Sequence, residues 1–324
     1  MKTANFTPEQ QSFIQKQQLG ESELLASIDG IIEKLKLGVV PSDRPIAVIV
    51  GGQCGAGKSG VIGNTLEKLN SNCVTIDNDN YRYAHPNLDE INSTHPEIFT
   101  ECTDQLSFSA TPKVIASMID GRYNMIIHQT LKNDTIVRCA MTDLLKAGYT
   151  VVVRALAVDK ITSIKDELGR GQKELALGKI PRWVPPENHD TAYNGLPGTV
   201  ELIENQGKYH MLEVVTRSED KNDLNNIGVI YRVINSGTSL ARIIDLEGYG
   251  FSTEKIKNHS SAKAAVENGR AQDASKTMAT IDEDLSKMKA VATTPEEQVR
   301  IKRIEDIVEE YTLSGSKRKQ NGEE

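Results

Sequence analysis

A phosphate-binding loop is the clearest chemical signal in this sequence. Residues 51–59, Gly-Gly-Gln-Cys-Gly-Ala-Gly-Lys-Ser, contain the pattern G-x-x-x-x-G-K-[ST]. In such a loop the backbone N–H groups surround phosphate oxygens, the lysine reaches the β- and γ-phosphates, and the final hydroxyl binds Mg²⁺. The sequence therefore predicts a site for ATP or GTP with Mg²⁺, in which Lys58 contacts the phosphates and Ser59 the metal. The predicted nucleotide-binding residues are Gly52, Gln53, Cys54, Gly55, Ala56, Gly57, Lys58 and Ser59.

Two aspartates follow the next β-rich run. The sequence Val-Thr-Ile at residues 74–76 leads into Asp77, Asn78 and Asp79. Transfer of a phosphoryl group to a hydroxyl needs a carboxylate that accepts the hydroxyl proton, and an aspartate at a strand end can supply it. Asp-Asn-Asp is equally an ordinary turn sequence. Spacing alone therefore leaves both alternatives open. His85, in the following His-Pro-Asn sequence, is expected in a turn that forms the wall of the site.

Short β-rich runs that alternate with helical segments must position these residues. The runs cover residues 46–50, 73–76, 124–128, 151–158 and 229–233, and a helix is expected over residues 60–69. This alternation predicts an α/β fold of the P-loop kinase type, with a mostly parallel sheet flanked by helices. Ligands bind such sheets at the carboxyl ends of the strands. The loop, Asp77, Asp79, His128 and Asp159 all lie at strand ends, so we expect them along one edge.

Three regions are expected along the chain. Residues 1–44 should form helices packed on the core, because Thr-Pro-Glu-Gln at residues 7–10 is a helix start and residues 22–37 have helical periodicity. Residues 45–250 should form the kinase core. Within it, residues 160–197 are rich in charge, glycine and proline, which predicts a lid-like helix followed by an irregular connection.

The third region, residues 251–324, should be a helical extension whose last ten residues form a frayed tail. A second Thr-Pro-Glu-Glu helix start occurs at residues 294–297. It precedes a stripe of apolar residues at helical spacing, formed by Ile301, Ile304, Val308 and Tyr311. Surface helices usually bury such a stripe, so we expect it to dock on the core.

Composition narrows the class of protein. The net charge of −7 and the 5% aromatic content argue against a nucleic-acid-binding body, which needs clustered Lys and Arg. No signal-peptide core or membrane span is evident, which predicts no membrane partner. The four cysteines show neither paired nor metal-binding spacing. These features together predict a protein of the reducing cytoplasm.

Three segments together resemble the zeta toxin family of toxin–antitoxin systems. They are GGQCGAGKS at residues 51–59, VTIDNDNY at residues 74–81 and HPNLDE at residues 85–90. The resemblance implies a P-loop kinase that uses ATP or GTP to phosphorylate a sugar hydroxyl of UDP-N-acetylglucosamine. It also implies a small helical antitoxin as a partner that blocks the nucleotide site.

The resemblance also implies roles for individual residues. Lys58 and Ser59 match the phosphate and Mg²⁺ positions, and Asp79 matches the catalytic base. Arg170 matches a helix arginine that contacts nucleotide phosphates. Arg182 matches a second such arginine if one residue is deleted between them. Two arginines in a mobile connection would also suit a lid that closes over transferring charge.

The acceptor side departs from the family pattern. Where the family has Glu-Gly-Thr after a strand, this chain has His128, Gln129 and Thr130, and no acid stands near Pro112, where the family has a second substrate-binding Glu. Thr130 matches a threonine of the family's substrate site. The candidate acceptor-site residues are Asp77, His85, His128 and Thr130. Three functions stay open: a UDP-N-acetylglucosamine kinase, a kinase for another small-molecule acceptor, and a nucleotide-binding module without transfer activity.

Overall fold

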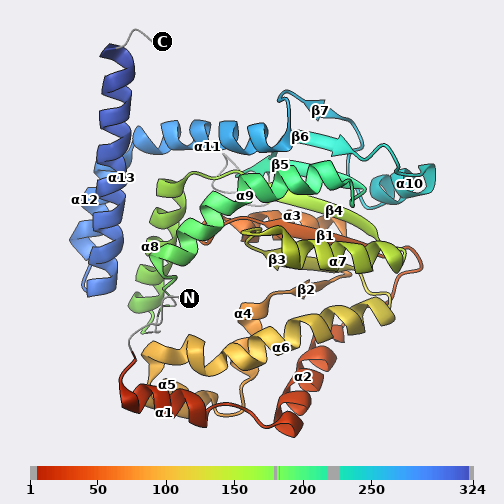
Figure 1. The fold of residues 1–324 in the computed structure, drawn as a ribbon, viewed down its shortest axis with the longest axis horizontal. Coiled ribbons are helices and arrows are strands. Elements are labelled where there is room, and N and C mark those ends of the chain that lie inside the picture. Colours follow the sequence, from red (N-terminus) through yellow and green to blue (C-terminus); the bar gives the residue numbers. More distant parts are fainter. Residues whose placement is uncertain (1–5, 179–180, 182, 218–226, 321–324) are drawn as a thin grey trace.

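The fold is built on one twisted sheet. The computed structural model describes residues 6–178, 181, 183–217 and 227–320 (Figure 1). In this part of the chain seven strands form a sheet with the order β2-β3-β1-β4-β5-β6-β7. The first five strands in this order, β2, β3, β1, β4 and β5, run parallel to one another. The pairs β5–β6 and β6–β7 are antiparallel. The prediction of an α/β fold with a mostly parallel sheet is therefore confirmed. The strands are β1 (Ile46–Gly51), β2 (Val74–Ile76), β3 (Met125–Gln129), β4 (Thr150–Leu156), β5 (Met211–Thr216), β6 (Gly228–Ile234) and β7 (Ile256–Lys257).

Helices cover both faces of the sheet. The helices of the described residues are α1 (Pro8–Lys16), α2 (Glu21–Lys36), α3 (Lys58–Lys68), α4 (Asn78–Tyr81), α5 (Leu88–Thr94), α6 (Phe99–Asp120), α7 (Asp134–Lys146), α8 (Lys160–Ala176), α9 (Pro186–Gln206), α10 (Leu240–Gly248), α11 (Ala262–Met278), α12 (Ile281–Val291) and α13 (Pro295–Gln320). Two short 3₁₀ turns follow α4 and α5. No helix in the described part of the chain is long and apolar enough to cross a bilayer.

Alternate residues of the central strands feed two separate cores. Ala47 and Ile49 of β1 pack in one cluster with buried side chains of α2, α6, α7, α9 and α11. Val48 and Val50 pack in the other cluster with Val61 of α3 and Leu246 of α10. A strand buried on both faces needs apolar residues at every position, which explains the continuous apolar run that predicted β1. The helix that follows the phosphate loop therefore covers one face together with α10, and α2, α6, α7, α9 and α11 cover the other.

The sequence analysis did not predict β5, because Glu213 interrupts its apolar run. Glu213 is 1% exposed and lies between Arg154 of β4 and Arg232 of β6, at 2.8 and 2.6 Å. Arg154 also donates to Asn64 Oδ1 and Thr65 Oγ1 of α3, both at 2.9 Å. The buried carboxylate is thus fully paired by its neighbours across the sheet, as a buried charge must be. This network also fixes α3 against the sheet.

The predicted irregular connection is wrong for residues 186–197, which belong to α9. Pro186 stands in the first turn, where a missing N–H costs nothing, and one stripe of the helix buries Leu196, Val200 and Ile203. Pro197 inside the helix leaves the Tyr193 carbonyl without its usual donor. Arg270 of α11 supplies one, because its Nη2 donates to that carbonyl at 2.9 Å. Tertiary contacts thus stabilise a helix that the prolines argued against.

The C-terminal helices hold α8 in place. Ile301 and Ile304 of α13 are 2% and 0% exposed and share a cluster with Ile164 and Leu168 of α8. The predicted docking stripe is therefore confirmed for these two residues. At its end, Tyr311 donates a hydrogen bond to Asp159 Oδ1 at 2.9 Å. Residues 160–176, expected in a lid-like segment, form a helix that packs against α11 and α13.

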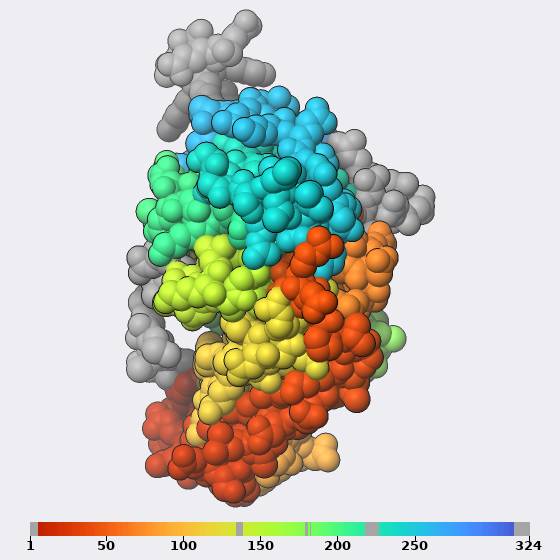
Figure 2. Space-filling view, turned by 90° about the vertical axis from the view of Figure 1, so that its right-hand side faces the viewer, coloured from red at the N-terminus to blue at the C-terminus, as the bar shows by residue number. Residues whose placement is uncertain are grey.

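The N-terminal helices lie at the end of the molecule opposite α11 (Figure 2). The predicted start of α1 is confirmed, because Thr7 and Gln10 form both hydrogen bonds of a capping box. Ile28 and Ile31 of α2 are buried in the same cluster as Leu106 and Val114 of α6. The N-terminal region therefore shares the hydrophobic core of the sheet through α6.

Candidate nucleotide and phosphoryl-transfer site

The phosphate loop joins β1 to α3 at the carboxyl edge of the sheet. Its backbone needs glycine at two positions, because Gly55 and Gly57 have φ angles of +72° and +87°. A Cβ atom on Gly55 would also lie 1.8 Å from the carbonyl oxygen of Ser163 in α8. The side chain of Gln53 is buried and donates to the Val158 carbonyl at 2.9 Å. The loop is therefore packed directly on α8 and on the segment that follows β4.

Lys58 begins α3 and turns back over its own loop. Its Nζ donates to the carbonyl oxygens of Gly52 and Gln53, at 2.6 and 2.8 Å. Burial, as the largest influence, lowers the pKa of Lys58. Arg170 lowers the pKa of Lys58 further, whereas Cys54 and the two aspartates Asp77 and Asp79 act against this shift. Lys58, both aspartates and Arg170 are therefore close enough to interact electrostatically.

Asp77 lies between α4 and the end of β3. Its Oδ1 accepts a hydrogen bond from the Asp79 N–H at 3.1 Å, and its Oδ2 lies 2.9 Å from His128 Nδ1. Burial, the largest influence, would raise the pKa of Asp77, but the hydrogen bond and charge of His128, the Asp79 amide and Lys58 together hold it below its usual value. Asp77 is therefore both the N-cap of α4 and the partner of His128.

His128 stands opposite Val50 in the register of β3 and β1, directly beside the start of the phosphate loop. Its Nδ1 contacts Asp77, and its Nε2 is buried without a hydrogen-bond partner in the described part of the chain. Thr130 follows β3 and is half-buried. The adjacency of β3 and β1 thus brings the predicted acceptor residues His128 and Asp77 to the loop.

Asp79 is the first acid of a chain of charges centred on the buried Arg82. Arg82 is 3% exposed, and its Nε lies 3.5 Å from Asp79 Oδ1. The Nη1 of Arg82 lies 2.7 Å from Asp104 Oδ1 of α6. The side chains of both aspartates are 39% exposed, so each keeps an accessible carboxylate face. The sequence analysis missed Arg82 and Asp104, because α6 meets α4 only in the tertiary structure.

His85 lies away from this group, toward the N-terminal helices. It is 4% exposed, its Nδ1 accepts from the Asn87 N–H at 3.2 Å, and its Nε2 lies 3.1 Å from the Gln17 carbonyl oxygen. Burial lowers the pKa of His85. Both ring nitrogens thus contact backbone groups, which fits the expected turn, and the structure does not bring His85 together with Lys58.

Two arginines from beyond β4 contact the loop. Arg170 of α8 lies with its Nη2 3.9 Å from the Cys54 sulfur. Arg217, immediately after β5, donates from Nε to the Ala56 carbonyl at 3.0 Å and from Nη2 to the Gly55 carbonyl at 2.8 Å. Sequence reasoning missed Arg217 because it missed β5. Arg182, the second predicted phosphate-contacting arginine, lies outside the described residues.

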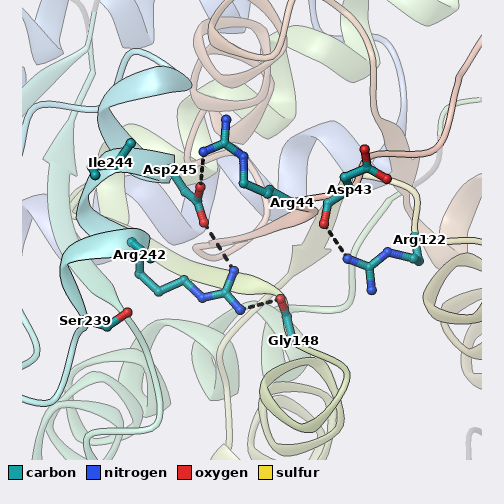
Figure 3. A pocket seen from close by; sticks show the side chains of 9 residues that line it. Asp43, Arg44, Arg122, Gly148, Ser239, Arg242, Ile244 and Asp245 are labelled. Carbon is teal, nitrogen blue, oxygen red and sulfur yellow. Dashed lines mark hydrogen bonds and ion pairs between the residues drawn. The ribbon is translucent and has the colours of Figure 1, made fainter.

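A pocket of about 560 Å³ opens at the other edge of the sheet, before β1 and β4 (Figure 3). Arg242 lies 3.2 Å from Asp245 Oδ2 and donates to the Gly148 carbonyl at 2.7 Å, and Arg44 lies 3.0 Å from Asp245 Oδ1. The charged groups of Arg242, Arg44 and Asp245 are therefore paired with one another. The pocket lies before β1 and β4, whereas the phosphate loop follows β1, so the two sites are separate. The volume of this pocket is therefore no reason to place the phosphoryl-transfer site in it.

Comparison with known proteins places the chain in a family. Residues 31–229 match the family model described as zeta toxin. The Toxin zeta of Enterococcus hirae is 27% identical over 187 residues, which are 57% of this chain and 65% of that protein. Toxin PezT of Streptococcus pneumoniae is 25% identical over 198 residues, which are 61% of this chain and 78% of that protein. The match thus spans just under two thirds of the length of the Enterococcus relative.

A solved structure gives the same fold. A chain from the PezAT chromosomal toxin–antitoxin system of Streptococcus pneumoniae matches with a TM-score of 0.58 and 21% identity, covering 80% of this chain and 97% of that chain. At this identity the likeness is one of fold. The family model, in contrast, matches more than half of the sequence, including the phosphate loop and the Asp77–Asp79 segment. The chain therefore belongs to the zeta toxin family.

Proposed function

We propose that the protein is a kinase that transfers the γ-phosphate of ATP or GTP to a hydroxyl group of a small molecule. The observation that carries this proposal is the grouping of Lys58 with two carboxylates, Asp77 and Asp79, and one guanidinium, Arg170, at a phosphate loop. Phosphoryl transfer needs this combination, because cations must balance the charge of the moving group and a carboxylate must accept a proton.

The side chains at the loop fit a nucleotide with Mg²⁺. Magnesium usually keeps several waters and takes one or two protein oxygens together with phosphate oxygens. Ser59 is exposed at the start of α3 next to Lys58, and ionised Asp77 lies near the same loop. Ser59 would hold the ion, which when bound neutralises phosphate charge. Lys58 and Arg170 would bind the phosphate oxygens.

Asp79 is the proposed base. Its carboxylate is 39% exposed, so an acceptor hydroxyl can reach it, and Arg82 contacts one of its oxygens from the protein interior. That ion pair helps to orient the carboxylate that is proposed to accept the hydroxyl proton. Orientation of this kind is a large part of catalysis in phosphoryl transfer, where the protein does little covalent chemistry.

The acceptor is proposed to be UDP-N-acetylglucosamine or another hydroxyl-bearing small molecule. The second alternative is favoured by His128, whose ring stands beside the loop in a pair with Asp77. An imidazole and a carboxylate offer different hydrogen bonds to a ligand, and specificity depends on pairing such groups. Thr130 is proposed to lie on the acceptor side as well.

Incubation with ATP or GTP, Mg²⁺ and a metabolite panel that includes UDP-N-acetylglucosamine tests the proposal, with products identified by mass spectrometry. We expect a phosphorylated product with the wild-type protein and a loss of at least a hundredfold in rate with Asp79→Asn, in line with the usual contribution of a general base. Asp89→Asn, an exposed acid on α5, is the matched control. Full activity of Asp79→Asn would exclude Asp79 as the base, and nucleotide binding without any product would favour a binding module.

A partner and a compartment follow from the same proposal. The Streptococcus pneumoniae relative of solved structure comes from a toxin–antitoxin system. We propose that this protein likewise acts in the cytoplasm and is inhibited by a small helical antitoxin. Co-purification of the protein with the product of a neighbouring short gene, with loss of nucleotide binding in the complex, is the expected result. A complex that binds ATP as tightly as the free protein would contradict inhibition at the nucleotide site.

A further inference from the structure

Arg217 makes a set of contacts that none of the assigned roles explains. Its guanidinium donates to two successive carbonyl oxygens of the phosphate loop, Ala56 at 3.0 Å and Gly55 at 2.8 Å. A Cβ atom placed on Gly57 would lie 3.0 Å from Arg217 Nε. The planar guanidinium thus lies directly against the loop at the residue before Lys58.

These contacts fix the direction of two peptide groups. In a trans peptide the N–H points opposite to the C=O. Holding the Ala56 carbonyl therefore orients the Gly57 N–H to the other side of the loop. Holding the Gly55 carbonyl orients the Ala56 N–H, which donates to Gln53 O at 3.2 Å within the loop. Phosphate sites of this class are built from N–H groups on the concave side, with carbonyls outward.

Arg217 is itself held by α8. Its Nη2 forms an ion pair with Asp166 of α8, the helix that also contacts Gly55 through the backbone of Ser163. The side chain of Arg217 is 26% exposed, so part of the pair is shielded from water. The ion pair sets the position of the guanidinium, and the guanidinium sets the outer face of the loop.

We infer that Arg217 is a positioning residue for the nucleotide phosphates, acting through the loop carbonyls and anchored by Asp166. This inference rests on the proposed function, because it requires that the loop bind a nucleotide. It assigns Arg217, the residue after β5, a part in phosphate binding that no motif in the sequence marks. Arg217 acts through the Gly57 peptide group and not by contact with the base of the nucleotide.

Isothermal titration of the full-length protein with MgATP, and separately with inorganic tripolyphosphate, tests this inference. We expect Arg217→Ala to weaken both ligands by about tenfold, the usual effect of losing charge-assisted hydrogen bonds. Arg217→Lys keeps the charge but loses the planar fork, so it should recover the affinity only in part. Asp166→Asn keeps Arg217 but removes its ion pair, and should weaken the binding of both ligands by about threefold on the same grounds. Arg44→Ala, an arginine at the other edge of the sheet, is the control.

Four outcomes would overturn the inference. Unchanged affinity of Arg217→Ala would do so directly. Weaker MgATP binding with unchanged tripolyphosphate binding would assign Arg217 to the base, and full recovery by Arg217→Lys would assign the effect to charge alone. If Arg217→Ala unfolds, which its thermal midpoint would show, Asp166→Asn tests the inference in its place. Unchanged affinity of Asp166→Asn for both ligands would contradict the role of Asp166 as the anchor. A wild-type protein that binds neither ligand would contradict the proposed function itself.

Discussion

At the scale of single residues, the pair formed by Asp77 and His128 distinguishes this site from the family pattern, which has Glu in place of His128. The two side chains come from the ends of β2 and β3 and meet at 2.9 Å. Asp77 also caps α4, so the same carboxylate controls the helix that carries Asp79. A substitution of His128 is therefore expected to affect both the acceptor side of the site and the position of the candidate base, Asp79.

The pH dependence of this pair can be measured without an acceptor. Because the pKa of Asp77 is held below its usual value, its ionised form stabilises the folded state above pH 4, and this contribution is lost as the pH falls through the folded pKa. We expect His128→Asn to raise the pKa of Asp77 toward its ordinary value. Carbon-13 NMR titration of the Asp77 carboxyl measures the shift, and His95→Asn, a histidine paired with Glu97 elsewhere, should leave it unchanged.

The phosphate loop and the two aspartates could be predicted from the sequence because they are local patterns. Arg82, Asp104 and Arg217 could not be, because each reaches the site through tertiary packing. Arg82 and Asp104 meet across α4 and α6, and Arg217 depends on β5. Charged residues in helices and at strand ends are usually solvated, so their types alone give no signal.

At the scale of elements, α8 connects the phosphate loop to the C-terminal helices. α8 meets the loop at Gly55 through the backbone of Ser163 and Glu167, and the Glu167 side chain is 1% exposed. Arg300 of α13 donates to Glu167 Oε1 at 3.1 Å and lies over the Trp183 ring at 4.3 Å. The position of Arg170 at the loop therefore depends on contacts made far along the chain.

The Glu167–Arg300 pair gives a prediction at this scale. Arg300→Ala should lower the free energy of unfolding by about 3–5 kcal/mol, because it leaves the buried Glu167 carboxylate without its counter-charge and with the Val184 N–H as a hydrogen-bond donor. The double variant Glu167→Gln with Arg300→Met should lose less, since no buried charge remains. Denaturant unfolding of the single and double variants measures the difference. Lys302→Ala, from an exposed pair with Asp306, should change little. Equal losses in the single and double variants would contradict this account.

The contact between α8 and α9 predicts sensitivity to acid. His189 is fully buried, and its Nε2 lies 2.9 Å from Ser163 Oγ. Burial, followed by the charge of Arg303, lowers the pKa of His189 from 6.5 to about 4. Between these values the unfolded chain binds a proton that the folded chain does not, so stability falls as the pH drops from 6.5 toward 4. The loss is about 3.5 kcal/mol at most, from about 1.4 kcal/mol per pKa unit.

His189→Asn should reduce the dependence of the unfolding free energy on pH within this window. Urea unfolding at several pH values measures the slope. His210 contributes a second slope of the same sign, because burial and Arg242 lower its pKa to about 4 as well. An unchanged slope in a variant that lacks both histidines would show that neither imidazole is neutral in the folded state.

At the scale of the whole molecule, the chain extends beyond the family match without forming a separate unit. The match ends at residue 229, but α11 contributes Ala262, Ala265 and Val266 to the main core, each with 0% exposure. Regular alternation predicted the α/β architecture, and the stripe on α13 predicted its docking. The strand β7 has two residues, too few for any periodicity to show.

Truncation tests this integration. A chain that ends at Asn258 should be insoluble or molten, since it removes α11 and exposes the core beneath it, with Val266 alone contributing about 1.5–3 kcal/mol. A chain that ends at Leu313 keeps the buried residues Ile301, Ile304 and Ile307 of α13 and should unfold at nearly the wild-type temperature. Circular dichroism melts and gel filtration of both chains distinguish the outcomes. A folded, nucleotide-binding chain ending at Asn258 would instead show an accessory C-terminal region.

Because Cys54 lies in the phosphate loop, its rate of alkylation can report whether the loop is occupied. Burial raises the pKa of the Cys73 and Cys102 thiols to about 11, so these two should react slowly with alkylating reagents. Cys54 is half-buried beside Arg170, and Cys139 is exposed on α7. In a Cys139→Ser background, the labelling rate of one sulfur would therefore follow occupancy of the loop. Candidate nucleotides could then be ranked by how well they protect that sulfur, before any acceptor has been identified.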